Sequence, residues 1–119
     1  MRSTSLPYCF QAAVELPLSL AVQNSDGKLE CRDYCVTVVA ERPGLSELDV
    51  VLDFRALDAA LAAVLLPMDG KPLNELGING LADAVKIIAV AIAPALAEPV
   101  KLAAVSIRDG AGRQITLKQ

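Results

Sequence analysis

The side chains that could do chemistry in this chain of 119 residues are carboxylates, arginines and thiols, because the sequence contains no histidine. Histidine is the usual general base near neutral pH and the commonest protein ligand of metals. Acid–base chemistry would therefore fall to Asp or Glu, which are weak bases in water unless burial raises their pKa. The sequence excludes a histidine-liganded metal site.

Glu30 and Arg32 are oppositely charged residues two positions apart in a segment with strand character, so both side chains point to the same face. Two interpretations are open. Arg32 could bind an anionic ligand, such as a carboxylate or a phosphate. It could instead neutralise Glu30 and Asp69 in a cavity that has lost its function, and ion pairs that only fill a site are the commoner case.

Asp26 and Asp69 each precede a glycine, so turn chemistry accounts for both, with proton transfer as the alternative. Cys31 and Cys35 share a strand face, with Cys9 on the neighbouring strand, but their spacing matches no usual zinc motif. Structural thiols are far commoner than a three-thiolate site. An odd number of cysteines argues against a disulfide framework, so we expect reduced thiols in a cytoplasmic protein, and the spacing predicts no metal.

The elements that must position these residues begin with two strands. Apolar and polar residues alternate from Phe10 to Val22, which predicts a long, half-buried strand. Pro17 lies within it and cannot donate to a ladder, so a bulge or an edge position is expected there. A turn signal at 24–27 is followed by a second predicted strand over 29–40, and the pair forms a hairpin.

Two helices and two further strands follow. Asp53 can cap a helix that runs to Leu66, and Asn79 can cap a second helix that Pro94 ends or kinks. Strands are predicted at 100–107 and 114–117. The order β-β-α-α-β-β predicts an α+β fold in one domain over residues 1–119. We expect a four-stranded antiparallel sheet with both helices on one face.

Five segments carry a resemblance that spans nearly the whole chain. They are Phe10–Val14, Leu29–Tyr34, Val51–Phe54, Asp69–Asn74 and Val105–Asp109. In this order they resemble Phe-x-Ala-Ala-His, Leu-His-Gly-His-Asn-Tyr, Val-Ile-Asp-Phe, Asp-His-x-x-Leu-Asn and Val-x-Val-x-Glu of the 6-pyruvoyl-tetrahydropterin and 6-carboxy-tetrahydropterin synthase family. The resemblance implies the tunnelling fold (T-fold). It also implies a homo-oligomer, a hexamer of two paired rings, with sheets joined edge to edge and pockets at subunit borders.

The departures from the family pattern fall on its chemistry. The three positions that match the zinc-binding histidines are Val14, Glu30 and Arg32. Valine has no donor atom, and a guanidinium repels a divalent metal. The position of the catalytic cysteine matches Asp26, and the assisting Asp-His pair is reduced to Asp69 beside a glycine. Simultaneous loss of the Lewis acid, the base and its relay predicts that the synthase (lyase) reaction and its zinc cofactor are absent.

One family feature is retained in altered form. A carboxylate on the late strand grips the amino-pyrimidinone edge of a pterin or purine in this fold, and Asp109 matches it with a side chain shorter by one methylene. Asp109, Arg32 and Glu30 are therefore the candidate ligand-binding residues. Asp26 and Asp69 are the candidate catalytic residues if any catalysis remains.

The composition restricts the partners. Hydrophobic residues make up 54% of the chain and the mean hydropathy is +0.45. No apolar stretch reaches the roughly 20 residues of a membrane span, so the excess is expected in an oligomer interface. The net charge is −3 and the basic residues are scattered, which argues against nucleic acid as a partner.

Three functions remain open at this point. The first is a binding module for a pterin or purine, or an oligomeric scaffold, without lyase activity. The second is a metal-free enzyme in which Asp26, Asp69 and Arg32 act on a pterin. The third is a non-catalytic partner subunit of an active paralogue.

Overall fold

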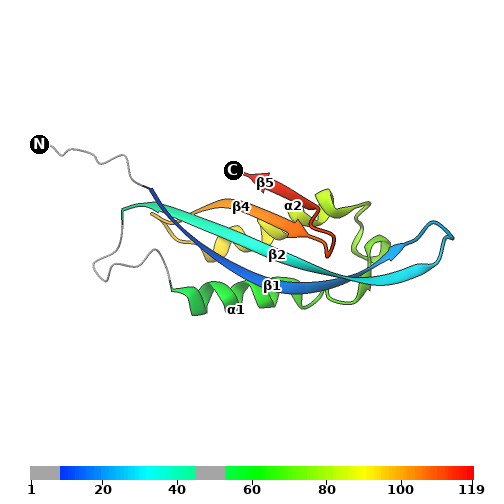
Figure 1. The fold of residues 1–119 in the computed structure, drawn as a ribbon. Coiled ribbons are helices and arrows are strands. Elements are labelled where there is room, and N and C mark those ends of the chain that lie inside the picture. The colour runs from blue at the N-terminus through cyan, green and yellow to red at the C-terminus, as the bar shows by residue number, and fades with distance from the viewer. Residues whose placement is uncertain (1–8, 45–52) are drawn as a thin grey trace, which may run out of the picture.

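Five strands in one sheet, two α-helices and two short 3₁₀ helices make up the computed structural model, which describes residues 9–44 and 53–119 (Figure 1). The sheet order is β3-β1-β2-β4-β5. The predicted α+β class and the order β-β-α-α-β-β are confirmed, with one short strand added. In chain order the elements are β1 (Cys9–Gln23), β2 (Leu29–Pro43), α1 (Phe54–Leu65), β3 (Lys71–Pro72), η1 (Leu73–Leu76), α2 (Leu81–Ile92), η2 (Ala93–Ala95), β4 (Lys101–Arg108) and β5 (Gln114–Lys118).

The β1–β2 hairpin is the longest feature of the molecule. Its register runs without a break from the pair Cys9↔Pro43 to the pair Gln23↔Leu29. Pro17 occupies the edge position expected for it, because β1 is flanked on its other side only by the two residues of β3. The turn at the tip is tied by Asn24, whose Oδ1 accepts from the backbone N–H groups of residues 26 and 28 at 2.9 and 3.0 Å.

One face of the sheet carries the hydrophobic core. Because side chains alternate along a strand, the even-numbered residues of β1 and β2 share this face, and both helices cover it. The prediction that both helices lie on one face is confirmed. The fully buried side chains that join the layers are Leu18 and Leu20 of β1, Val36 and Val38 of β2, Leu57 and Leu61 of α1, Val85, Ile88 and Ile92 of α2, and Val105 and Ile107 of β4.

The two helix starts differ in how well the sequence predicted them. Asp53 caps α1 as expected, since its Oδ1 accepts from the N–H of Arg55 at 3.0 Å. The predicted cap of α2, Asn79, is wrong. The N-cap is Gly80, in extended backbone, and the N–H of Asn79 instead donates to Oδ2 of Asp83 at 3.1 Å. Within the described part of the chain, no side chain caps the first turn of α2, and Asp83 instead ties the residue before the N-cap to the helix.

The segment Leu73–Ala95 is long and apolar enough to cross a membrane by length and composition, with a hydropathy of 1.7. Its only α-helix, α2, has 12 residues and is about 18 Å long at 1.5 Å per residue. A hydrocarbon core is about 30 Å thick. The buried side of α2 packs in the core, so the segment is accounted for as a core helix with flanking turns.

Candidate functional site

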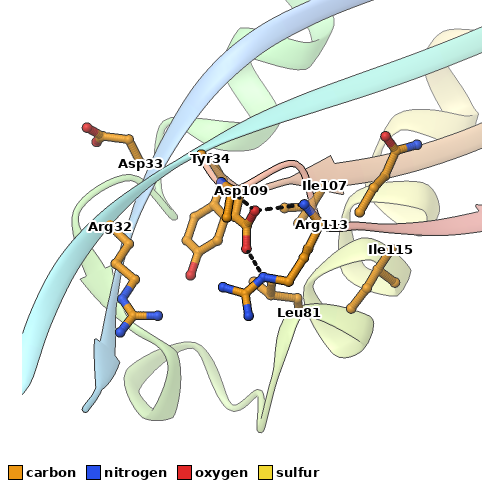
Figure 2. A pocket seen from close by; sticks show the side chains of 11 residues that line it. Arg32, Asp33, Tyr34, Leu81, Ile107, Asp109, Arg113 and Ile115 are labelled. Atoms are coloured by element: carbon orange, nitrogen blue, oxygen red, sulfur yellow. Dashed lines mark hydrogen bonds and ion pairs between the residues drawn. The ribbon is translucent and has the colours of Figure 1, made fainter.

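The main cavity lies where β2, the start of α2 and the β4–β5 turn meet (Figure 2). It opens to solvent and has a volume of about 590 Å³. Its lining combines apolar side chains with two arginines, two aspartates and one tyrosine. The lining residues are Arg32, Asp33, Tyr34, Leu81, Ile107, Asp109, Gly110, Ala111, Arg113, Gln114 and Ile115.

Two cavity residues are placed by β2. Tyr34 lies opposite Leu18 on the helix-covered face, and its side chain is buried. Arg32 lies two residues further along the same face, where the core ends, so its side chain is about half exposed. Its Nη2 is 3.4 Å from Oε2 of Glu30. The predicted pairing of these two charges is therefore present, but Glu30 does not line the cavity.

Asp109, the candidate pterin grip, is committed to its own turn. Its Oδ1 accepts from the backbone N–H groups of Ala111 and Arg113, both at 2.9 Å, and its Oδ2 accepts from Nε of Arg113 at 2.8 Å. These bonds lower the pKa of Asp109, and the bond from the Arg113 backbone N–H has the largest effect. A ligand edge with two N–H donors would have to share the Asp109 carboxylate with the Arg113 guanidinium or displace that guanidinium.

The two candidate catalytic carboxylates do not reach the cavity. Asp26 lies in the exposed turn at the tip of the hairpin. Asp69 follows α1, and its Oδ1 accepts from the backbone N–H of Ser19 at 2.9 Å, while the N–H of Gly70 donates to the Ser19 carbonyl at 2.7 Å. Asp69 thus holds the edge of β1. The structure does not bring Asp26, Asp69 and Arg32 into one site.

The positions that match the zinc ligands do not converge either. Val14 is buried in the core opposite Val38, whereas Arg32 lies opposite Leu20. Leu20 is six positions after Val14 on β1, which is about 20 Å at 3.3 Å per residue. Within residues 9–44 and 53–119, no three His, Cys, Asp or Glu side chains are grouped to hold a metal. The donor set does not fit a zinc ion.

Of the eleven lining residues, only Arg32 and Asp109 were predicted from the sequence, and the chief omissions are Tyr34 and Arg113. Tyr34 belonged to a matched motif but was not singled out, and Arg113 was not considered. A signal for Arg113 was present, because an aspartate four residues before an arginine across a Gly-rich turn is the spacing at which a carboxylate meets both a backbone N–H and a guanidinium. Two residues of another matched motif, Val51 and Leu52, lie outside the described residues.

A second polar cluster lies on the opposite face of the sheet. Glu15 is 3.6 Å from the Arg108 guanidinium and accepts from the Thr37 hydroxyl at 3.2 Å. Hydrogen bonds from Cys35 and Thr37 lower the pKa of Glu15. Burial raises the pKa of Cys35, and the hydrogen bond to Glu15 raises it further. A thiol with a raised pKa stays protonated at neutral pH, so Cys35 is not an activated nucleophile.

Solved structures share this architecture over nearly its full length. A 6-pyruvoyl tetrahydropterin synthase of Caenorhabditis elegans superposes with a TM-score of 0.79 at 14% identity, covering 98% of this chain and 99% of that one. The Plasmodium vivax synthase gives 0.71 at 11% identity, over 94% and 98% of the two chains. The chain has the 6-pyruvoyl tetrahydropterin synthase fold.

The likeness extends to an uncharacterised protein of Wolinella succinogenes, with a TM-score of 0.64 at 14% identity over 94% of this chain and 99% of that one. No sequence-family model matches the chain, and neither does any curated protein. The fold that the motif resemblance implied is therefore confirmed, on a sequence that is only 14% and 11% identical to these two synthases.

Proposed function

We propose that the chain is a divergent relative of the 6-pyruvoyl tetrahydropterin synthases that binds a small ring compound of pterin or purine size and does not carry out the zinc-dependent synthase reaction. The observation that carries the proposal is the grouping of Arg32, Tyr34 and Arg113 around one cavity. Figure 2 shows the two guanidinium groups on either side of the tyrosine ring. Aromatic and guanidinium groups suit a flat ligand, and an anionic group on that ligand would compete with Asp109 for Arg113 and with Glu30 for Arg32.

The size and lining of the cavity support a ligand of this class. Its volume of about 590 Å³ falls within the roughly 300–1,000 Å³ of small-molecule sites. Leu81, Ile107 and Ile115 supply apolar contact, and the charged groups can fix orientation. The same lining argues against the enzyme alternative, because Asp109 is occupied by its own turn and the other candidate carboxylates lie elsewhere.

We further propose that the protein is a cytoplasmic homo-oligomer in which sheets join edge to edge. The outer edges of β1 and β5 end the sheet, apart from the two-residue contact of β1 with β3. Pro17 has no N–H, and the N–H of Ser19 is taken by Asp69, so the second half of the β1 edge is blocked. The first half, Cys9–Glu15, is left to meet β5 of a neighbouring copy. All three cysteines are free, in agreement with a reducing compartment.

Thermal unfolding of the purified protein against a panel of pterins and purines, with and without phosphate or carboxylate groups, tests the proposed binding. A ligand at 100 times its Kd stabilises the folded state by about 2.7 kcal/mol. For a chain of this size the midpoint should rise by several degrees.

The matched variants are Arg32→Ala and Tyr34→Leu, which should abolish the shift, and Lys86→Ala on the outer face of α2, which should not. A shift that survives both cavity variants would place the ligand elsewhere. No shift with any charged compound would remove the binding proposal and leave an oligomeric scaffold or partner subunit.

A further inference from the structure

The far end of the β1–β2 hairpin has an open strand edge. β4 pairs with β2 only from Cys35 to Glu41, and the chain then turns back at Asp109. Among the residues that the structure describes, no strand pairs with the outer edge of β2 over Leu29–Asp33, and all five of these residues are exposed. Figure 1 shows this end of the hairpin extending past β4 and β5. Its segment Leu29–Asp33 is here called the arm.

The direction of the backbone groups on this edge follows from Pro17. Pro17 lies opposite Cys35, and because proline has no N–H, this pair cannot exchange hydrogen bonds. The N–H and C=O of Cys35 therefore point away from β1, toward β4. By alternation those of Leu29, Cys31 and Asp33 point the same way, beyond the end of β4. Three residues with unpaired donors and acceptors form a template for another strand.

The charges on this edge are arranged for a copy of itself. Glu30 and Arg32 flank Cys31 symmetrically. If two such strands pair antiparallel with Cys31 opposite Cys31, each Glu30 lies opposite an Arg32. The two residues of each Glu30–Arg32 pair do not exchange backbone hydrogen bonds. Their Cα atoms lie about 4.5 Å apart, so their side chains are close. Each charge then has opposite charges both along its own strand and across the pair.

We propose that Leu29–Asp33 is a self-association surface, which pairs with the same segment of a second copy across a two-fold axis at Cys31. Charged edge strands usually prevent pairing, because most partners leave those charges unmatched. Here a second copy matches both, which favours it over an unrelated strand. The surface is separate from the proposed β1–β5 contact, so the two interfaces can act together.

The pairing also involves the cavity. Arg32 lies on the cavity lining, and Glu30 of the second copy would lie beside it. The second copy therefore adds a carboxylate to the rim of a site that carries two arginines and two aspartates, and this carboxylate would compete with a ligand for Arg32.

Thiol crosslinking tests the pairing directly. In a Cys9→Ser, Cys35→Ser background, Cys31 is the remaining thiol, and the two Cys31 Cα atoms should lie about 5.5 Å apart. A short bismaleimide should crosslink two chains in high yield. Glu30→Arg alone and Arg32→Glu alone each place like charges opposite one another, and each should reduce the yield about tenfold. The double variant Glu30→Arg, Arg32→Glu restores the matched pattern and should restore the yield.

Mixing the two single variants gives the sharpest control, because each repels itself but matches the other. The mixture should crosslink as well as the parent protein, and circular dichroism should show that every variant is folded. The proposal is overturned if the parent does not crosslink at Cys31, if the single reversals crosslink equally well, or if neither the double variant nor the mixture recovers. Ligand-induced stabilisation is measured separately, so failure here leaves the proposed binding function standing.

Discussion

Three of the aspartates that the sequence singled out serve to hold backbone. Asp109 and Asp53 accept N–H groups at the start of a turn and a helix, and Asp69 accepts one from the edge strand. Each also sits where a motif or a turn signal drew attention to it in the sequence. A carboxylate that accepts backbone N–H groups is stabilised in its charged form, which makes it a better anchor and a poorer base at neutral pH.

Asp109 should make the stability of the fold dependent on pH in the acidic range. Its folded pKa lies below its ordinary value of 3.8, so its contribution to the free energy of unfolding is complete above that value. The contribution is lost as the pH falls through the folded pKa. Asp109→Asn should therefore lower the denaturant midpoint at pH 6, and the gap from wild type should narrow below pH 3.8.

Urea unfolding at a series of pH values measures this effect. Asp58→Asn, on the exposed face of α1, is the control and should change the denaturant midpoint only slightly. A constant gap between wild type and Asp109→Asn across the acidic range would show that the charge of Asp109 does not contribute.

The hairpin register predicts which histidine substitutions can bind zinc. Val14→His combined with Glu30→His and Arg32→His should bind zinc no better than the two β2 substitutions alone, because Val14 is about 20 Å along β1 from the partner of Arg32. Val22→His in the same background places a histidine directly opposite position 30 and should raise the affinity at least tenfold. Isothermal titration with zinc compares the three variants. Equal affinities for the two triple variants would contradict the register.

At the scale of elements, α2 offers a matched pair of positions that separates packing from helix propensity. Ile88 is fully buried, whereas Val90 is 75% exposed on the same helix. Ile88→Ala should cost about 2–5 kcal/mol through lost burial and the cavity left behind. Val90→Ala should change stability by less than about 0.5 kcal/mol. Denaturant unfolding at pH 7 checks both, and similar costs at the two sites would contradict the packing of α2 against the sheet.

The elements with a clear period were predictable from the sequence, and those without one were not. Alternation over thirteen residues defines β1, and the aspartate before Phe54 marks the start of α1. β3 was missed because two residues in a parallel contact carry no periodicity. The start of α2 was misplaced by one residue, because an asparagine before a glycine looks like a cap whether or not its side chain bonds the helix.

The candidate site was predictable only in part, because motif order along the chain does not reveal register across a hairpin. Val14, Glu30 and Arg32 follow the spacing of three converging ligands, yet an unbroken ladder closed by a tight turn separates the first from the others. Arg32 and Asp109 do share a cavity, because the end of β4 lies beside the part of β2 where the arm begins to extend past it. The role of Arg113 was predictable from its spacing after Asp109 across a Gly-rich turn, but the resemblance drew attention to Asp109 alone.

For the whole molecule, the outer edges of β1 and β5 differ in what they offer a neighbour. On β1, Pro17 and the bond from Ser19 to Asp69 leave only the first half open. On β5 the direction of each N–H follows from the ladder. Arg108 lies opposite Cys35 and bonds toward β2, so Ile107 bonds to Ile115 on β5. The N–H of Thr116 therefore points outward, away from its own sheet.

This geometry allows a proline to test the proposed edge-to-edge assembly. Thr116→Pro removes an outward N–H and leaves the β4–β5 hydrogen bonds intact, and proline is tolerated on edge strands in this orientation. If β5 joins the first half of β1 in a neighbouring copy, the variant should remain folded, and its mass by analytical ultracentrifugation should fall from that of the oligomer toward 12.5 kDa. Thr116→Ala should keep the native mass.

The reciprocal substitution Ala13→Pro acts on the other edge. By the alternation that points Ser19 outward, the N–H of Ala13 also faces outward, so this variant should dissociate the oligomer as Thr116→Pro does. Leu117→Pro removes an N–H that bonds to β4 and should instead destabilise the fold. An oligomer that survives both edge prolines would have to be held by another surface. If the Cys31 crosslink also persists, the arm would be that surface, and the assembly would be a dimer with open edges.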